Sequence, residues 1–187
     1  ILGEIFGYEN NAKGMLLVTA NANMIDGNSP ETNIAAITRT YNAADPAGTY
    51  GQTVPALETF FPFSDPILAT GARHDNAYRS NLGVASLAMF QDVTIHFRVL
   101  DPAGTAVAEG TRTVSKLSMR QWSFKQLGVS PIEGAMTVEV WLDEEDVADD
   151  PCDFGSPSIL AYVSKVDIGT GDAEFIYAFW TTNNSCE

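Results

Sequence analysis

The stretch that decides the fold reads Val93-Thr94-Ile95-His96-Phe97-Arg98-Val99. Its odd-numbered residues are apolar and its even-numbered residues are polar, so the side chains alternate with a period of two. This period is typical of a β-strand that has one face in a core and the other in water. Residues 101–104 contain a proline and a glycine and predict a turn. Residues 106–115 predict the return strand of a hairpin.

Further strands are predicted on both sides of this hairpin. They comprise residues 15–19, 34–41, 136–142, 158–166 and 174–180. Residues rich in glycine, proline, asparagine and aspartate separate them, and only residues 120–127 have a weakly helical pattern. Many short strands between turn residues predict an all-β protein with an antiparallel β-sandwich.

The composition excludes several classes of protein. The chain has 187 residues, of which 45% are hydrophobic, which is enough for a buried core and too much for a disordered chain. Its net charge of −14, from 24 acidic and 10 basic residues, opposes binding to phosphates and to anionic lipids. No apolar run approaches the roughly 20 residues that a membrane helix requires. We therefore expect an extracellular, acidic protein with no nucleic-acid partner and no membrane insertion.

Two parts of the sequence resemble each other at a spacing of about 120 residues. The aligned segments are residues 14–19 with 134–139, 34–40 with 158–166, and 52–56 with 174–178. The second copy is preceded by the strand-rich residues 78–122, which have no counterpart in the first copy. We therefore predict the back half of a β-sandwich module in residues 1–57, a connecting segment in residues 58–77 and a complete module in residues 78–187.

Three motifs extend this picture. Residues 78–84 read Tyr-Arg-Ser-Asn-Leu-Gly-Val, residues 93–104 comprise the first strand and the turn of the predicted hairpin, and residues 161–172 include Ala-Tyr-Val-Ser-Lys-Val-Asp and Thr-Gly-Asp. They resemble the opening, hairpin and closing motifs of repeated immunoglobulin-like modules in large secreted bacterial proteins. The resemblance implies an immunoglobulin-like sandwich with one whole module and a half-module, located outside the cell or at the surface of a bacterium. It implies no catalytic residues.

An acidic insertion departs from that family. Its carboxylates belong to Asp143, Glu145, Asp146, Asp149, Asp150 and Asp153. Calcium takes six to eight oxygen ligands, which such a loop could supply, although the spacing is not that of an EF-hand. A solvated loop that adds to solubility is the other interpretation. No other cofactor is expected.

Cysteines occur only at positions 152 and 186. Both lie among polar residues, where free thiols are a liability and a disulfide is a common extracellular device. We predict a disulfide between Cys152 and Cys186, with two unpaired thiols as the alternative.

Catalytic motifs are poorly represented. The chain has two histidines, His74 and His96, and it lacks a Gly-x-Ser-x-Gly elbow, closely spaced metal ligands and a phosphate-binding glycine loop. Alternation places Trp141 on the polar side of its strand, where its indole could stack on a sugar ring. We therefore expect a protein that is not an enzyme.

Two functional hypotheses remain. The first is an extracellular structural or adhesive module that associates through its surfaces or strand edges, for example as a subunit of a filament or array. Its partners would be other copies of itself or other modules of the parent protein. The alternative is a glycan-binding module of a secreted protein.

Overall fold

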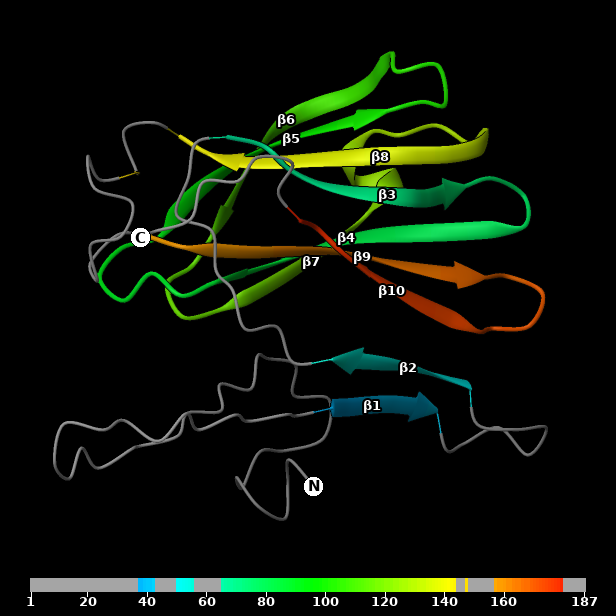
Figure 1. The fold of residues 1–187 in the computed structure, drawn as a ribbon, viewed down its shortest axis with the longest axis horizontal. Helices are drawn as coiled ribbons and strands as arrows, with labels where there is room; N and C mark the ends of the chain where they lie inside the picture. The colour runs from blue at the N-terminus through cyan, green and yellow to red at the C-terminus, as the bar shows by residue number, and fades with distance from the viewer. Residues whose placement is uncertain (1–36, 43–49, 56–64, 144–146, 148–156, 180–187) are drawn as a thin grey trace, which may run out of the picture. The chain divides into compact units, whose positions relative to one another are not determined.

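The computed structural model describes residues 37–42, 50–55, 65–143, 147 and 157–179 (Figure 1). The chain divides into two compact units, Ile1–Ile34 and Ala35–Glu187, and all described residues belong to the second. The elements are β1 (Ile37–Asn42), β2 (Tyr50–Pro55), β3 (Ile67–His74), β4 (Tyr78–Ser86), β5 (Val93–Leu100), β6 (Ala106–Val114), β7 (Met119–Ser123), the 3₁₀ helix η1 (Phe124–Leu127), β8 (Ile132–Leu142), β9 (Ile159–Asp167) and β10 (Ala173–Tyr177). No helix in these described ranges is long and apolar enough to cross a membrane.

Two antiparallel four-stranded sheets form a sandwich (Figure 1). One sheet has the strand order β10-β9-β4-β7, and we call it the β9 sheet. The other has the order β3-β8-β5-β6, and we call it the β8 sheet. Strands β1 and β2 form a separate two-stranded hairpin. The predicted all-β sandwich is therefore confirmed, while its immunoglobulin-like character stays a prediction.

Alternate residues of both sheets point into one core. The odd-numbered residues of β5 from Val93 to Val99 are each at most 1% exposed, as are the even-numbered residues of β8 from Met136 to Leu142. Ile159, Ala161 and Val163 of β9 join them from the opposite sheet. Burial of these side chains is the main favourable contribution to folding. The alternating stretch that predicts β5 is therefore also the stretch that builds the core.

The predicted hairpin of residues 93–115 is confirmed. Strands β5 and β6 pair from Val93 with Val114 to Leu100 with Ala106. Asp101 Oδ1 accepts hydrogen bonds from the backbone N–H groups of Ala103 and Thr105, which closes the turn between them.

The weakly helical pattern of residues 120–127 is only half right. Residues 119–123 form β7 and pair with β4, and the helix η1 covers only Phe124–Leu127. Ser123 and Gln126 form a capping box at its start, and Gly128 in the left-handed conformation ends it. Pairing with β4 overrides the local pattern in the first half of the segment.

The sandwich extends into the segment that the sequence predicts as a connection. Strand β3 lies within residues 58–77 and pairs with β8, beginning with Ile67 opposite Val140. The register shifts twice along this pair, between Thr70 and Ala72 and between Ala72 and His74, and Gly71 at the first shift has φ +98°. These irregularities interrupt the alternation by which β3 could be predicted.

The repeat is visible as two hairpins. Strands β1 and β2 pair antiparallel, as do β9 and β10, in agreement with the aligned segments. The register differs from the alignment by one residue, because Arg39 lies opposite Thr53 whereas Lys165 lies opposite Glu174.

One side of the sandwich is closed by the backbone. The N–H of Leu68 donates to the carbonyl of Phe179 at 2.9 Å, and the N–H of Phe179 donates back at 3.0 Å. These bonds join β3 to the chain just after β10, which links the two sheets. Strands β6 and β7 are the edges on the other side.

Candidate functional site

The outward side of the β8 sheet carries the predicted binding aromatic, Trp141. We call this side the polar face, and its members are His96, Arg98, Glu139 and Trp141. Trp141 lies opposite His96 in the register of β8 and β5, and the two rings stack with centroids 5.2 Å apart and an interplanar angle of 12°. The histidine therefore covers part of the indole surface that a sugar would need.

Arg98 completes the surroundings of Trp141. Its guanidinium carbon lies 5.4 Å from the centroid of the indole, and its Nη1 donates to Glu139 Oε2 at 3.3 Å. A guanidinium over an indole is a cation–π contact, worth about 0.5–1 kcal/mol at an exposed site. The polar face thus combines a half-buried indole with the hydrogen-bonding side chains of Arg98 and Glu139. These two side chains are also hydrogen-bonded to each other.

Asp143, the first residue of the acidic insertion, contacts the polar face through His96. Asp143 Oδ1 lies 2.5 Å from Nε2 of His96. The remaining candidate calcium ligands, Glu145, Asp146, Asp149, Asp150 and Asp153, lie outside the described residues, so calcium binding stays a prediction. Among the residues that are described, no three His, Cys, Asp or Glu side chains are arranged to hold a metal. Cys152 and Cys186 also lie outside this part of the chain.

The second histidine lies at a corner between the two sheets. The ring of His74 packs edge-on against Phe124, with centroids 6.0 Å apart. The next residue, Asp75, accepts hydrogen bonds from Nε of Arg73 at 2.9 Å and from the N–H groups of Ala77 and Tyr78. Burial raises the pKa of Asp75, but the hydrogen bonds from these backbone groups and from Arg73 outweigh it, so the pKa lies below 3.8.

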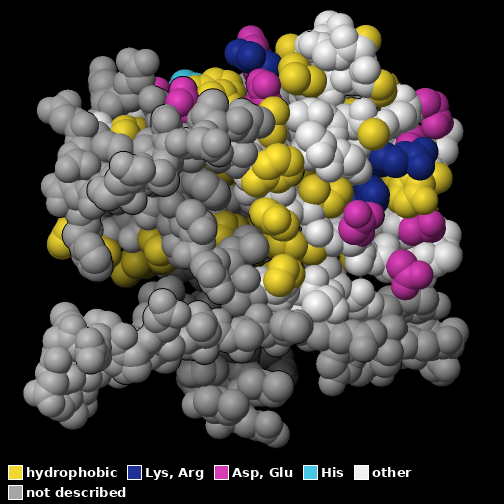
Figure 2. Space-filling view, in the orientation of Figure 1, with side chains coloured by type: hydrophobic (Ala, Val, Ile, Leu, Met, Phe, Trp, Pro, Cys, Tyr) yellow, Lys and Arg dark blue, Asp and Glu magenta, His cyan; other side chains and the backbone are white. Residues whose placement is uncertain are grey.

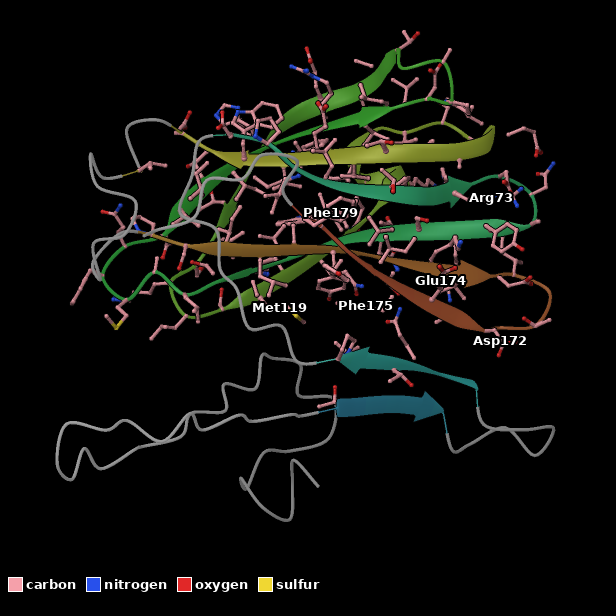
Figure 3. The ribbon with its side chains drawn as sticks, viewed as in Figure 1. Arg73, Met119, Asp172, Glu174, Phe175 and Phe179 are labelled. Atoms are coloured by element: carbon pink, nitrogen blue, oxygen red, sulfur yellow. The ribbon has the colours of Figure 1, made fainter. Side chains whose placement is uncertain are left out.

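Ser80 stabilises this corner through two hydrogen bonds with the backbone of Arg73. Its hydroxyl accepts from the backbone N–H of Arg73 at 3.0 Å and donates to the carbonyl of Arg73 at 2.7 Å. The Arg73 guanidinium lies 4.2 Å from the centroid of the Tyr78 ring. Residues 78–80 of the opening motif therefore stabilise the connection between β3 and β4. Figure 3 shows Arg73 at the same end of the sandwich as Asp172 and Glu174.

An exposed apolar surface lies where β4 runs into β5 and β6 into β7. Its members are Met89, Phe90 and Leu117, which are 49%, 78% and 55% exposed, and we call it the apolar tip. The N–H of Leu117 donates to the carbonyl of Ala88, and Ser86 N–H donates to Ser118, so the two connections are held side by side. Leu117 adopts φ +47°, an unusual conformation for a leucine. The apolar tip is thus an ordered surface rather than two independent loops.

The apolar tip is not among the surfaces that the sequence motifs predict. A signal for it is present nonetheless, because residues 87–90 are four consecutive apolar residues that precede the strand beginning at Val93. A run of this kind outside a strand or helix indicates either a buried loop or an interaction surface.

The outward side of the β9 sheet has an apolar centre, with the exposed polar residues Arg79 and Gln121 beside it. Met119, Tyr162 and Phe175 lie on it together with Gly83, and we call it the apolar face; Figure 3 labels Met119 and Phe175 on one side of this sheet. The rings of Tyr162 and Phe175 stack at 4.7 Å, and the Tyr162 hydroxyl donates to Sδ of Met119 at 3.5 Å. Burial raises the pKa of Tyr162.

Gly83 makes room for this arrangement. It lies opposite Tyr162 in the register of β4 and β9, and a Cβ built on Gly83 would overlap the tyrosine ring. The ring therefore lies directly over the glycine backbone. The glycine and tyrosine of the opening and closing motifs are partners in packing.

Hydrophobic side chains are also exposed where β10 passes β3. Tyr177 and Phe179 are both about half exposed, and their rings make an edge-on contact at 6.3 Å. Figure 2 shows hydrophobic side chains gathered in the middle of the described surface, in the region where Figure 3 labels Phe179.

Comparison with known proteins gives no further constraint on these surfaces. No protein-family model matches the chain, and neither a curated protein nor a solved structure matches it.

Proposed function

We propose that the chain is a non-enzymatic, extracellular β-sandwich module of a bacterial surface, with a structural or adhesive role, and that it acts by associating with further copies of itself. The observation that carries the proposal is the apolar tip. Three large apolar side chains are held in water there by hydrogen bonds between two connections. Ordered apolar surfaces of this kind mark interaction sites.

The charge at the apolar tip is compatible with a second copy as the partner. Lys116 is exposed beside Leu117, and its backbone N–H donates to the carboxylate of the exposed Asp92, so the tip carries one cation and one carboxylate. The whole chain carries a net charge of −14, which makes two copies repel each other. The repulsion is weakest where acidic and basic side chains balance, as they do at the tip.

Both histidines have contacts within the sandwich, as expected for residues with a structural role. His74 packs on Phe124, and His96 stacks on Trp141 and pairs with Asp143.

Sedimentation velocity over a range of micromolar concentrations tests this proposal. We expect the wild-type sedimentation coefficient to rise with concentration, and the variant Phe90→Ser to remain monomeric. The control is Ile168→Ser, because Ile168 is 54% exposed but lies beside Ala77 at the other end of β4. A wild-type chain that stays monomeric at the highest concentration, or equal behaviour of the two variants, would overturn the proposal.

Glycan binding at the polar face is the second candidate function. It rests on the half-buried indole of Trp141 with Arg98 and Glu139 beside it, which offers stacking and hydrogen bonds to a sugar. A glycan array that detects binding by the wild type and loss of binding by Trp141→Ala would favour it over association. The stacked ring of His96 leaves less of the indole available, which favours the first function.

A further inference from the structure

Two further residues on the outward side of the β9 sheet, beside the apolar face, are more buried than is usual for outward-facing positions. Ser164 and Val166 of β9 are only 6% and 9% exposed, although neither belongs to the core cluster between the sheets. Val163 and Lys165, the neighbours of Ser164 and Val166 along the strand, point to the opposite side of the sheet, because side chains alternate along a strand. Side chains that are outside the core and shielded from water require a covering layer on the outward side.

One contact identifies that layer. Oγ of Ser164 donates a hydrogen bond to Oε1 of Gln52 at 3.2 Å, across 112 positions of sequence. Gln52 belongs to β2. The covering group therefore comes from the β1–β2 hairpin.

The β1–β2 hairpin requires packing against another part of the protein to be stable. An isolated two-stranded hairpin is at best marginally stable in water. On β2, Gln52 and Val54 are half-buried whereas Thr53 and Pro55 are exposed, so one side of the strand is covered. Thr38 of β1 donates to the carbonyl of Val54, which holds the hairpin itself together but buries no apolar surface.

We propose that the apolar face is a docking surface for the β1–β2 hairpin of the same chain. The stacked rings of Tyr162 and Phe175 provide the apolar area, and Ser164 provides the polar contact that sets the position of β2. Because Gly83 has no side chain, the Tyr162 ring lies against the backbone of β4 and does not project from the sheet. This docking differs from association at the apolar tip, and neither requires the other.

Hydrogen exchange measured by mass spectrometry on the full chain tests the docking. We expect the amides of residues 50–54 to be protected in the wild type, to the same degree at low and high protein concentration. Val54→Lys should abolish this protection, while Thr53→Lys, at an exposed position of the same strand, should leave it unchanged. The amides of β5 report whether the sandwich is intact in each variant.

A variant on the sandwich side completes the test. Tyr162→Ala should remove the protection of residues 50–54 while the β5 amides stay protected. Trp141→Ala on the polar face should leave the protection of residues 50–54 unchanged. Hairpin amides that exchange as an unprotected peptide in the wild type would overturn the proposal. Protection that disappears on dilution would also overturn it, because the hairpin would then belong to a second copy.

Discussion

The two outward sides of the sandwich differ in kind. The polar face carries residues that hydrogen-bond or stack with their neighbours in water, such as Arg98 with Glu139 and His96 with Trp141. The apolar face carries Tyr162 stacked on Phe175 above a glycine, and buried residues lie beside them. An antiparallel sheet needs only one buried face. A second buried face on the β9 sheet therefore indicates a surface that has a partner, whereas the polar face is stable in water as it is.

Truncation of the central aromatic residue on each face should show the largest difference. We expect Tyr162→Ala to lower the free energy of unfolding by about 3 kcal/mol, because it removes a half-buried ring that packs on the backbone of Gly83 and stacks with Phe175. Trp141→Ala should cost only about 1 kcal/mol, because the stack and the cation–π contact that it removes lie near water. Chemical denaturation of both variants measures the difference. Equal losses would contradict the contrast between the faces.

The packing of Tyr162 on Gly83 should be visible as coupling. Gly83→Ala should destabilise the wild type by about 2 kcal/mol, because the added methyl group displaces the ring. In the Tyr162→Ala background the same change should cost much less, which a double-mutant cycle measures. Gly110→Ala serves as the control, because its Cβ would lie 3.3 Å from the Phe97 ring, a tight contact that a small shift relieves, and should cost about 1 kcal/mol. Additive losses at positions 83 and 162 would show that the two residues do not interact.

Acid should weaken the hydrogen bonds of Asp75 in the connection between β3 and β4 and so lower the free energy of unfolding. Asp75 has a lowered pKa in the folded chain, so its contribution to stability is present above the unfolded value of 3.8 and is lost as the pH falls through the folded pKa. We expect Asp75→Asn to cost about 1–2 kcal/mol near neutral pH and to make the unfolding free energy depend less steeply on pH below about 4. Glu133→Gln, which removes a more distant partner of Arg73, should follow the wild-type curve. A parallel pH dependence for Asp75→Asn and the wild type would contradict this role.

The ion pair of the polar face should have the smallest effect. A double-mutant cycle with Arg98→Gln and Glu139→Gln should give a coupling of about 0.5 kcal/mol, which falls as salt is added. A coupling of several kcal/mol would mean that this pair is shielded from water, and the contrast between the faces would not hold.

Strands with regular alternation could be predicted from the sequence, and β3 could not. In β5 the side chains alternate without interruption, so the strand, its buried side and its hairpin follow from the sequence alone. In β3 small residues and two register shifts obscure the pattern, and its pairing with β8 is fixed by residues about 70 positions away.

The candidate surfaces were predictable to different degrees. Alternation correctly places Trp141 on the outward side of β8. The apolar tip depends on the conformation of Leu117 and on hydrogen bonds between two connections, which no local pattern encodes. The apolar face depends on the pairing of Gly83 with Tyr162 across two strands, and each residue alone is ambiguous.

Hydroxyl-radical footprinting of the full chain at increasing concentration tests most directly whether association occurs through the apolar tip. Modification of Met89 and Phe90 should fall as concentration rises, while modification of Trp141 on the polar face stays constant. Ile168, exposed at the other end of β4, serves as the internal reference. The proposed function would be contradicted if modification of Met89 and Phe90 did not change with concentration, or if Trp141 became protected in their place.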